Sequence, residues 1–294
     1  MAEAITVAVQ RGGTVESRHR VHAVAVQDGT VVGEAGEGGL LTFMRSAAKP
    51  LQAMPLTRAL PELAEDELAI ACSSHLARPE QLAAVRSLLA RAPAGEDELE
   101  CGEEGDPPAR VKHNCSGKHA GMLALCRAHG WDSRGYRLPD HPCQRAMRAE
   151  VASAADLDPD ELATGVDGCG VVAFALPLER MALAFGRLER LDGGDRVASV
   201  MRGQPALIRG PDGVDTTIMR AHEGWIAKGG AEGVMCAAGP RGLGVALKIE
   251  DGEARAVGPA TAAFLSRLGY PIEKLESAAV ENSHGEEVGE IRAE

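Results

Sequence analysis

Hydrophobic positions near the start of the chain either alternate with polar ones or form short β-branched runs. Two such runs, at residues 5–10 and 21–26, are followed by an Asp28-Gly29 turn that leads into residues 30–34. This pattern predicts an opening antiparallel meander. Three more strands are predicted late in the chain, between glycine-containing turns, at residues 225–228, 233–237 and 243–250.

The central part of the chain changes to the 3.6-residue period of amphipathic helices. A first helix is expected from Ser46, because Pro50 would lie near its start, where the missing N–H breaks no intrahelical hydrogen bond. The polar stretch 92–112 is expected to be a long loop, and residues 285–294 a frayed acidic tail beyond the last regular element. The same period predicts helices at residues 79–91, 118–129, 142–155, 176–191, 196–207 and 259–268.

Strands at both ends of the chain, with helices between them, indicate a mixed α/β (α+β) fold. We expect one antiparallel sheet built from both termini, with helices on its faces. The sheet is predicted from about residues 1–45 and 215–270, and the helical middle from about residues 46–210. No internal repeat or low-complexity linker divides the sequence, so residues 1–294 are predicted to form a single unit.

Composition narrows the range of partners. Hydrophobic residues make up 45% of the chain but aromatic residues only 3%, so Ala, Val and Leu must pack most of the core. The formal net charge of −12 disfavours nucleic acid or an anionic membrane as partner, because both would repel the protein. No cationic start precedes a long apolar run, and no stretch of about 18 apolar residues occurs, so a cytoplasmic protein is expected.

The segment Arg45-Ser46-Ala47-Ala48-Lys49-Pro50 places a hydroxyl and an amine three residues apart at the start of a helix. Residues i and i+3 share a helical face, so Lys49 can reach Ser46. A neutral lysine can take the serine proton and make the hydroxyl an acyl-transfer nucleophile, as in the Ser-x-x-Lys motif of penicillin-binding proteins and serine β-lactamases. The alternative is an ordinary N-cap serine.

Two further positions could serve the same pocket. Ser74, in Cys72-Ser73-Ser74-His75, could present a second hydroxyl, although spacing alone favours a loop or cap serine. Lys228 ends a strand-like run before two glycines, where positive charge and edge N–H groups would suit a developing oxyanion. Lys248 competes for this role, but it precedes Asp251-Gly252 in an expected hairpin and is predicted to be a solvated strand residue.

A fourth group of residues has metal-ligand character. The seven cysteines are an odd number at irregular spacings, which predicts free thiols, structural or metal-binding, rather than a disulfide framework. Cys115 enters a helix, and Cys169 lies in a glycine-flanked loop; two thiolates, one nitrogen and a water would make a tetrahedral zinc site. His119 is the more ordinary nitrogen ligand, whereas Lys118 must first lose a proton. The alternative is a pair of buried structural cysteines.

Four ordered blocks together resemble the asparaginase family typified by the inducible, thermolabile rhizobial L-asparaginase. The resemblance covers nearly the whole chain. It implies hydrolysis of L-asparagine to L-aspartate and ammonia, a fold similar to serine β-lactamases and bacterial glutaminases, and a homodimer. The blocks are Met44-Arg45-Ser46-Ala47-Ala48-Lys49-Pro50-Leu51-Gln52, Ser73-Ser74-His75, His113-Asn114-Cys115-Ser116-Gly117-Lys118-His119-Ala120-Gly121-Met122 and Asp167-Gly168-Cys169-Gly170.

The resemblance also implies roles for individual residues. It makes Ser46 and Lys49 the catalytic pair, and Ser74 and Lys228 a second Ser–Lys pair. It implies a zinc ion held by Cys115, Lys118 and Cys169, which decides against His119.

Charge complementarity makes Arg45 and Asp167 candidates for the α-carboxylate and α-ammonium of the substrate. Because Ser46 and Lys49 already supply a nucleophile and a base, zinc is expected to be auxiliary. The substrate is expected to be a small molecule. Two alternatives remain open. One is a glutamine-directed or β-lactam-interacting serine hydrolase, because the one methylene that separates asparagine from glutamine changes substrate preference by only ~1–3 kcal/mol. The other is a non-catalytic zinc or amino-acid binding protein.

Overall fold

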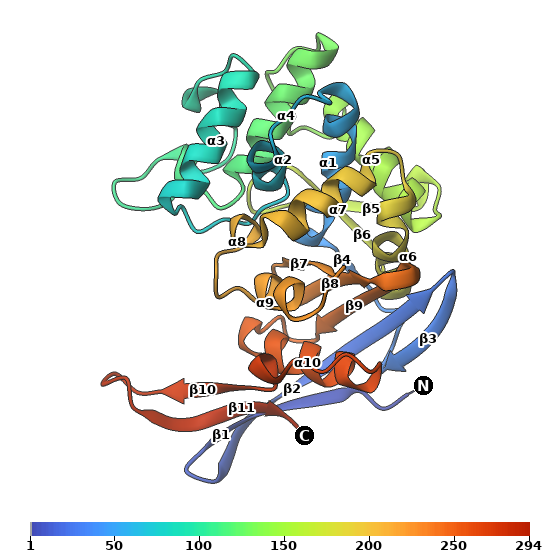
Figure 1. Ribbon diagram of the computed structural model, residues 1–294, viewed down its shortest axis with the longest axis vertical. Helices are drawn as coiled ribbons and strands as arrows, with labels where there is room; N and C mark the ends of the chain where they lie inside the picture. Colours follow the sequence, from blue (N-terminus) through green and yellow to red (C-terminus); the bar gives the residue numbers. More distant parts are fainter. Residues whose placement is uncertain (1) are drawn as a thin grey trace.

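The computed structural model of the protein describes residues 2–294. Its large antiparallel sheet has eight strands, in the order β10-β11-β1-β2-β9-β8-β7, with β3 also paired to β2 (Figure 1). The bounds of these strands are β1 Ile5–Arg11, β2 Thr14–Gln27, β3 Thr30–Ala35, β7 Ile226–Gly230, β8 Val234–Gly239, β9 Leu243–Ile249, β10 Ser277–Glu281 and β11 Glu287–Ala293.

Both ends of the chain contribute strands to this sheet, which confirms the predicted antiparallel sheet and its opening meander. The prediction of a frayed tail at residues 285–294 is wrong, because β11 pairs with β1 in a register that sets Val9 opposite Ile291. Ile291 is buried in this pairing. The acidic residues of this segment suggested that it is exposed to solvent and irregular. A strand, however, can expose alternate side chains while its backbone is fully paired.

Helices cover both faces of the sheet. The helix α6 (Leu178–Arg187) approaches the backbone of β9 at Gly244, where a Cβ would meet a carbonyl of α6. The helix α10 (Val257–Arg267) lies against Gly33 of β3. Gly33 is in register with Ala25, and Ala25 with Val245, the residue after Gly244. Successive residues of a strand face opposite sides, so α6 and α10 cover opposite faces.

The middle of the chain forms a helical region beside the sheet (Figure 1). Here α3 and α5 have the bounds that the sequence predicted, and the segment from Ser46 is a 3-10 turn over Arg45–Ala48 that continues into α1 with Pro50 in its first turn. The bounds of these helices are α1 Lys49–Ala59, α2 Glu65–Ala71, α3 Pro79–Arg91, α4 Ser116–His129, α5 Pro142–Ala155, α7 Gly194–Gly203, α8 Pro205–Ile208 and α9 Val214–Ala221.

The predictions differ from the structure at several places in this region, and the helices α2 and α9 were not predicted. The middle is not wholly helical, because β4 (Leu41–Phe43), β6 (Val172–Pro177) and β5 (Ala163–Val166) form a small antiparallel sheet. The helix predicted at residues 176–191 therefore starts only after Pro177. The helix predicted at residues 196–207 is divided before Pro205, whose ring cannot continue it.

The seven cysteines are all free, as predicted, and all of them are buried. Within residues 2–294, no helix is both long enough and apolar enough to cross a membrane.

Candidate active site

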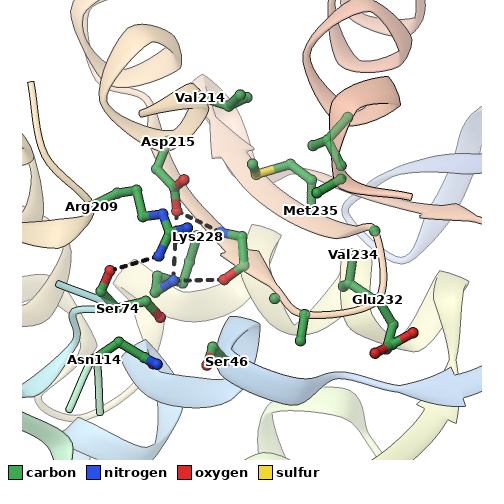
Figure 2. Close-up of a pocket in the computed structure, with 16 residues that line it drawn as sticks. Ser46, Ser74, Asn114, Arg209, Val214, Asp215, Lys228, Glu232, Val234 and Met235 are labelled. Carbon is green, nitrogen blue, oxygen red and sulfur yellow. Dashed lines mark hydrogen bonds and ion pairs between the residues drawn. The ribbon is translucent and has the colours of Figure 1, made fainter. Parts of the chain in front are cut away.

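A cavity of about 360 Å³ lies between the helical region and the β7–β8 edge of the large sheet (Figure 2). Its walls come from the Arg45–Ala48 turn, the loop before α3, the start of α9, and the turn between β7 and β8. The polar side chains that line it are Ser46, Ser74, Asn114, Arg209, Asp215, Lys228 and Glu232. Three of the four predicted catalytic residues thus reach one cavity, and the fourth lies just beneath it.

Ser46 follows a strained backbone turn that packs closely against β7. The preceding residue, Arg45, has a φ of 50°, a left-handed conformation that is costly for a residue with a Cβ. The carbonyl of Met44 lies against β7, where a Cβ built on Gly230 would meet it at 2.8 Å. Glycine at position 230 therefore lets β7 approach the Ser46 turn closely.

Lys49 lies beneath the cavity and contacts the second serine. Its buried ammonium donates a 3.0 Å hydrogen bond to the Ser74 hydroxyl and another to the Ser73 carbonyl. Within residues 2–294 the Ser46 hydroxyl makes no hydrogen bond. Burial lowers the pKa of Lys49 below the ordinary lysine value, although nearby Cys115 raises it in part. The i, i+3 spacing therefore placed Lys49 on the correct helix, but its hydrogen bond goes to a residue 25 positions away.

Lys228 is buried in the cavity wall beside a carboxylate. Its Nζ atom lies 3.6 Å from Asp215 Oδ1 and donates a 2.6 Å hydrogen bond to the Gly229 carbonyl (Figure 2). Burial lowers the pKa of Lys228 to about 8, and the attraction of Asp215 opposes this shift. A lysine whose pKa is near neutrality can exchange a proton during a reaction.

Lys248 does not line the cavity. The expectation that it is solvated is wrong, because it is buried and donates a hydrogen bond to the Ile249 carbonyl. The hairpin expected after it is also wrong, since the chain leaves β9 for α10. Its position on β9 supports the choice of Lys228, which the sequence had left open.

Arg45 and Asp167 bind each other. The Arg45 Nε and Nη2 atoms lie 3.0 and 2.9 Å from Asp167 Oδ1, and its Nη1 atom lies 3.9 Å from Glu232. Neither Arg45 nor Asp167 lines the cavity, although Ser46 and Glu232 connect the pair to its edge. The two predicted substrate-binding residues thus form an ion pair at the rim of the site.

Cys115, Lys118 and Cys169 come together, as zinc binding requires. The Lys118 Nζ atom lies 3.2 Å from Cys169 Sγ, and Cys115 neighbours Cys169. The interaction with Cys169 lowers the pKa of Cys115 far below the ordinary thiol value. Burial opposes the charged form of Lys118, but the two sulfur atoms raise its pKa above the ordinary value. Lys49 neighbours both Ser74 and Cys115, so this cluster adjoins the cavity.

The donor set fits zinc only with lysine as a ligand. Within the described part of the chain, no three His, Cys, Asp or Glu side chains converge in a way that could hold a metal ion. His119 Nδ1 forms a 2.7 Å hydrogen bond with the Tyr136 hydroxyl, and its buried Nε2 has no hydrogen-bond partner among residues 2–294. Two thiols and the Lys118 amine are therefore the sulfur and nitrogen donors available here, and a thiolate pair with one nitrogen suits Zn²⁺.

Sequence reasoning missed several residues of the cavity. Asp215 belongs to α9, a helix that the sequence pattern did not predict, and an acidic residue in a first helical turn is common for electrostatic reasons alone. Arg209 reaches the cavity from the preceding loop and donates a 3.1 Å hydrogen bond to the Ser74 carbonyl. It forms no ion pair within residues 2–294, so its charge is available to an anionic group. Asn114 precedes the predicted zinc ligand Cys115, but nothing in the sequence around it indicated that it would line the cavity.

Eighteen chains of solved structures resemble this chain, among them the following two. One is named "putative beta-lactamase from Bacteroides dorei DSM 17855" and is 11% identical, with 84% of this chain and 93% of that chain covered and a TM-score of 0.45. The other is a Bacillus subtilis glutaminase in covalent complex with 5-oxo-L-norleucine, 12% identical, with 86% and 89% covered and a TM-score of 0.41.

A search of the curated proteins found no match. The family model described as L-asparaginase II matches residues 7–293. That match spans nearly the whole chain and both walls of the cavity, so the chain belongs to the L-asparaginase II family and is an amidohydrolase.

Proposed function

We propose that this amidohydrolase converts L-asparagine to L-aspartate and ammonia through an acyl-enzyme on Ser46. The observation that supports this most is the 3.0 Å hydrogen bond from buried Lys49 to Ser74, beneath a cavity that is also lined by Ser46 and Lys228. A serine in a cavity with two buried amines is what nucleophilic amide hydrolysis needs.

In the proposed mechanism, Lys49 acts as the base. Burial favours its neutral amine, which accepts the Ser46 proton as the hydroxyl oxygen bonds to the carboxamide carbon. The C–N bond then breaks and ammonia leaves with that proton. Water next attacks the acyl ester, and Ser46 regains a proton as aspartate is released. Ser74 and Lys228 transfer protons and stabilise the negative charge that develops on the carbonyl oxygen.

The charged ends of the substrate are assigned to the rim of the cavity. A zwitterion can lie antiparallel to the Arg45–Asp167 ion pair, so that each of its charges faces the opposite one. Arg209, which forms no ion pair among residues 2–294 and donates a hydrogen bond to the Ser74 carbonyl, is the alternative site for the α-carboxylate. The family resemblance also leads us to propose a homodimer. The cytoplasmic location stays a prediction.

We further propose that Cys115, Lys118 and Cys169 hold an auxiliary zinc ion. Bound there, the metal would supply a fixed positive charge that orders the Asp167–Gly170 loop and positions the substrate. The chain's own residues then perform the proton transfers, since Ser46 and Lys49 do not need a metal-activated water.

The function is tested by measuring ammonia release from L-asparagine and L-glutamine, and hydrolysis of a chromogenic cephalosporin, by the purified protein. Faster turnover of asparagine than of the other two supports the proposal. Preference for glutamine or the cephalosporin would identify one of the other serine hydrolases. Binding of asparagine without ammonia release would identify a binding protein.

Ser74 is a second candidate nucleophile, because Lys49 donates its hydrogen bond to Ser74 and not to Ser46. A diazoketone analogue of asparagine can trap the nucleophile covalently. Ser46 and Ser74 lie on different tryptic peptides, residues 46–58 and 59–86, so mass spectrometry separates them. Label on the peptide of residues 59–86 would overturn the assignment of Ser46.

A further inference from the structure

We propose that Asp215 is the positioning residue for Lys228, holding its ammonium group in place at the cavity wall and keeping it charged until it is needed. This inference rests on the proposed function, because it assigns a partner to one of the proposed catalytic groups.

Two contacts hold the Lys228 ammonium group, and a third holds the backbone next to it. Asp215 Oδ1 lies 3.6 Å from Lys228 Nζ and accepts a 2.6 Å hydrogen bond from the backbone N–H of Gly229. Lys228 Nζ in turn donates to the Gly229 carbonyl at 2.6 Å. One carboxylate thus binds both the side chain and the backbone of the end of β7 (Figure 2). Removing it would free the lysine to move within the cavity.

Burial makes this ion pair strong. The side chains of Lys228 and Asp215 are only 1% and 6% exposed, so water screens their attraction very little. Burial alone would drive Lys228 to its neutral form, and Asp215 opposes that effect. The other titratable or charged groups that face Lys228 do less to keep it charged. Lys49 and Arg209 are cations that lower its pKa, and burial keeps Cys72 and Cys236 as neutral thiols. Cys115 is the other anionic group, and it raises the pKa of Lys228 less than Asp215 does.

The hydrogen bond between Asp215 and Gly229 changes the role that was expected of Gly229 and Gly230. The N–H of Gly229 points to Asp215, so it is not available to stabilise an oxyanion. Positive charge from Lys228 must therefore supply more of that stabilisation, which makes the placement of its ammonium group more important.

The direction of the pH effect follows from the charge. Loss of the Asp215 carboxylate would lower the pKa of Lys228, because the ammonium would lose its nearest anion. Any limb of the pH–rate profile that reports Lys228 must then move to lower pH, whether the amine or the ammonium is the active form. An opposite charge at this distance changes such a midpoint by about one pH unit or more.

The test compares pH profiles of kcat/KM for asparagine. Asp215→Asn keeps an acceptor for Gly229 but removes the charge, and Asp215→Ser is a second uncharged variant in case Asp215→Asn folds poorly. Asp212→Asn is the matched control, since Asp212 is an exposed acid in the same segment and does not line the cavity. Lys228→Met identifies the limb that belongs to Lys228, and circular dichroism confirms that each variant is folded.

We expect the Lys228-dependent limb to move to lower pH by about one unit in Asp215→Asn or Asp215→Ser and to stay in place in Asp212→Asn. In the Lys228→Met background, Asp215→Asn should cause no further shift. An active wild type whose Lys228 limb does not move in folded Asp215 variants would overturn the inference and leave the function intact. A wild type that releases no ammonia would overturn both.

Discussion

Two buried lysines near Lys49 have pKa shifts in opposite directions. Lys118, in the thiol cluster, lies 3.2 Å from Cys169 with Cys115 close by, and its pKa is raised above the ordinary value although burial opposes this. Lys228, in the cavity wall, lies 3.6 Å from one carboxylate, and burial lowers its pKa to about 8. Both lysines are buried, so the number and distance of the anions near each one account for the difference between their pKa shifts.

This difference separates the chemistry of the two regions. A lysine that titrates near neutrality can transfer protons, whereas one held charged by two sulfur atoms must lose its proton before it can bind a metal. The cavity is therefore expected to govern turnover, and the thiol cluster to govern substrate affinity.

The strongest test of the difference between the cavity and the thiol cluster is at Ser46. Ser46→Ala and Lys49→Ala should each lower kcat by at least ~10³-fold, because nucleophile and base act as one unit. The double variant should be little worse than either single one. Steady-state ammonia release checks both statements. Near-normal activity of Ser46→Ala would show that the nucleophile lies elsewhere.

A smaller loss is expected from the second Ser–Lys pair. Ser74→Ala and Lys228→Met should each reduce kcat by about 10²-fold, the usual scale for proton transfer and oxyanion stabilisation. Lys248→Met is the control, because Lys248 is also a buried strand lysine but does not line the cavity. A greater loss in Lys248→Met than in Lys228→Met would mean that the wrong lysine was assigned.

Activity should also depend on the close contact between the backbone of β7 and the turn that carries Ser46. Gly230→Ala would bring a Cβ to 2.8 Å from the Met44 carbonyl, so the Ser46 turn must shift. We expect kcat to fall about tenfold, equivalent to about 1.4 kcal/mol of transition-state stabilisation. Gly39→Ala is the matched control, because its Cβ would meet nothing within 4 Å. Equal kinetics for the two variants would argue against a tightly held turn.

The thiol cluster should have the smallest effect on turnover. Cys169→Ser should lower the zinc content, and removal of zinc should raise KM about three- to tenfold, a cost of roughly 1 kcal/mol, while kcat changes less. Cys126→Ser, farther along α4, is the control for loss of a buried thiol. Metal analysis and kinetics at saturating asparagine provide the measurements. If turnover vanished without zinc in folded protein and returned with it, the metal would be catalytic.

Local pattern predicted much of the fold. The bounds of α3 and α5 and the meander of β1–β3 follow from periodicity and turn residues that act over a few positions. The small sheet was missed because β4, with three residues, and β5, with four, are too short to show a period. The strand β11 was missed because its partner β1 lies at the other end of the sequence.

The sequence by itself determined an antiparallel sheet built from both termini, free thiols, and a Ser-x-x-Lys segment at a helix start, because these depend on composition and short spacing. Only the tertiary structure decided that Lys49 donates to Ser74, that Arg45 pairs with Asp167, and that Asp215 faces Lys228. Each of these contacts joins segments that are brought together by packing. Charge and burial at such a contact depend on all the surrounding elements, and no spacing along one segment can report them.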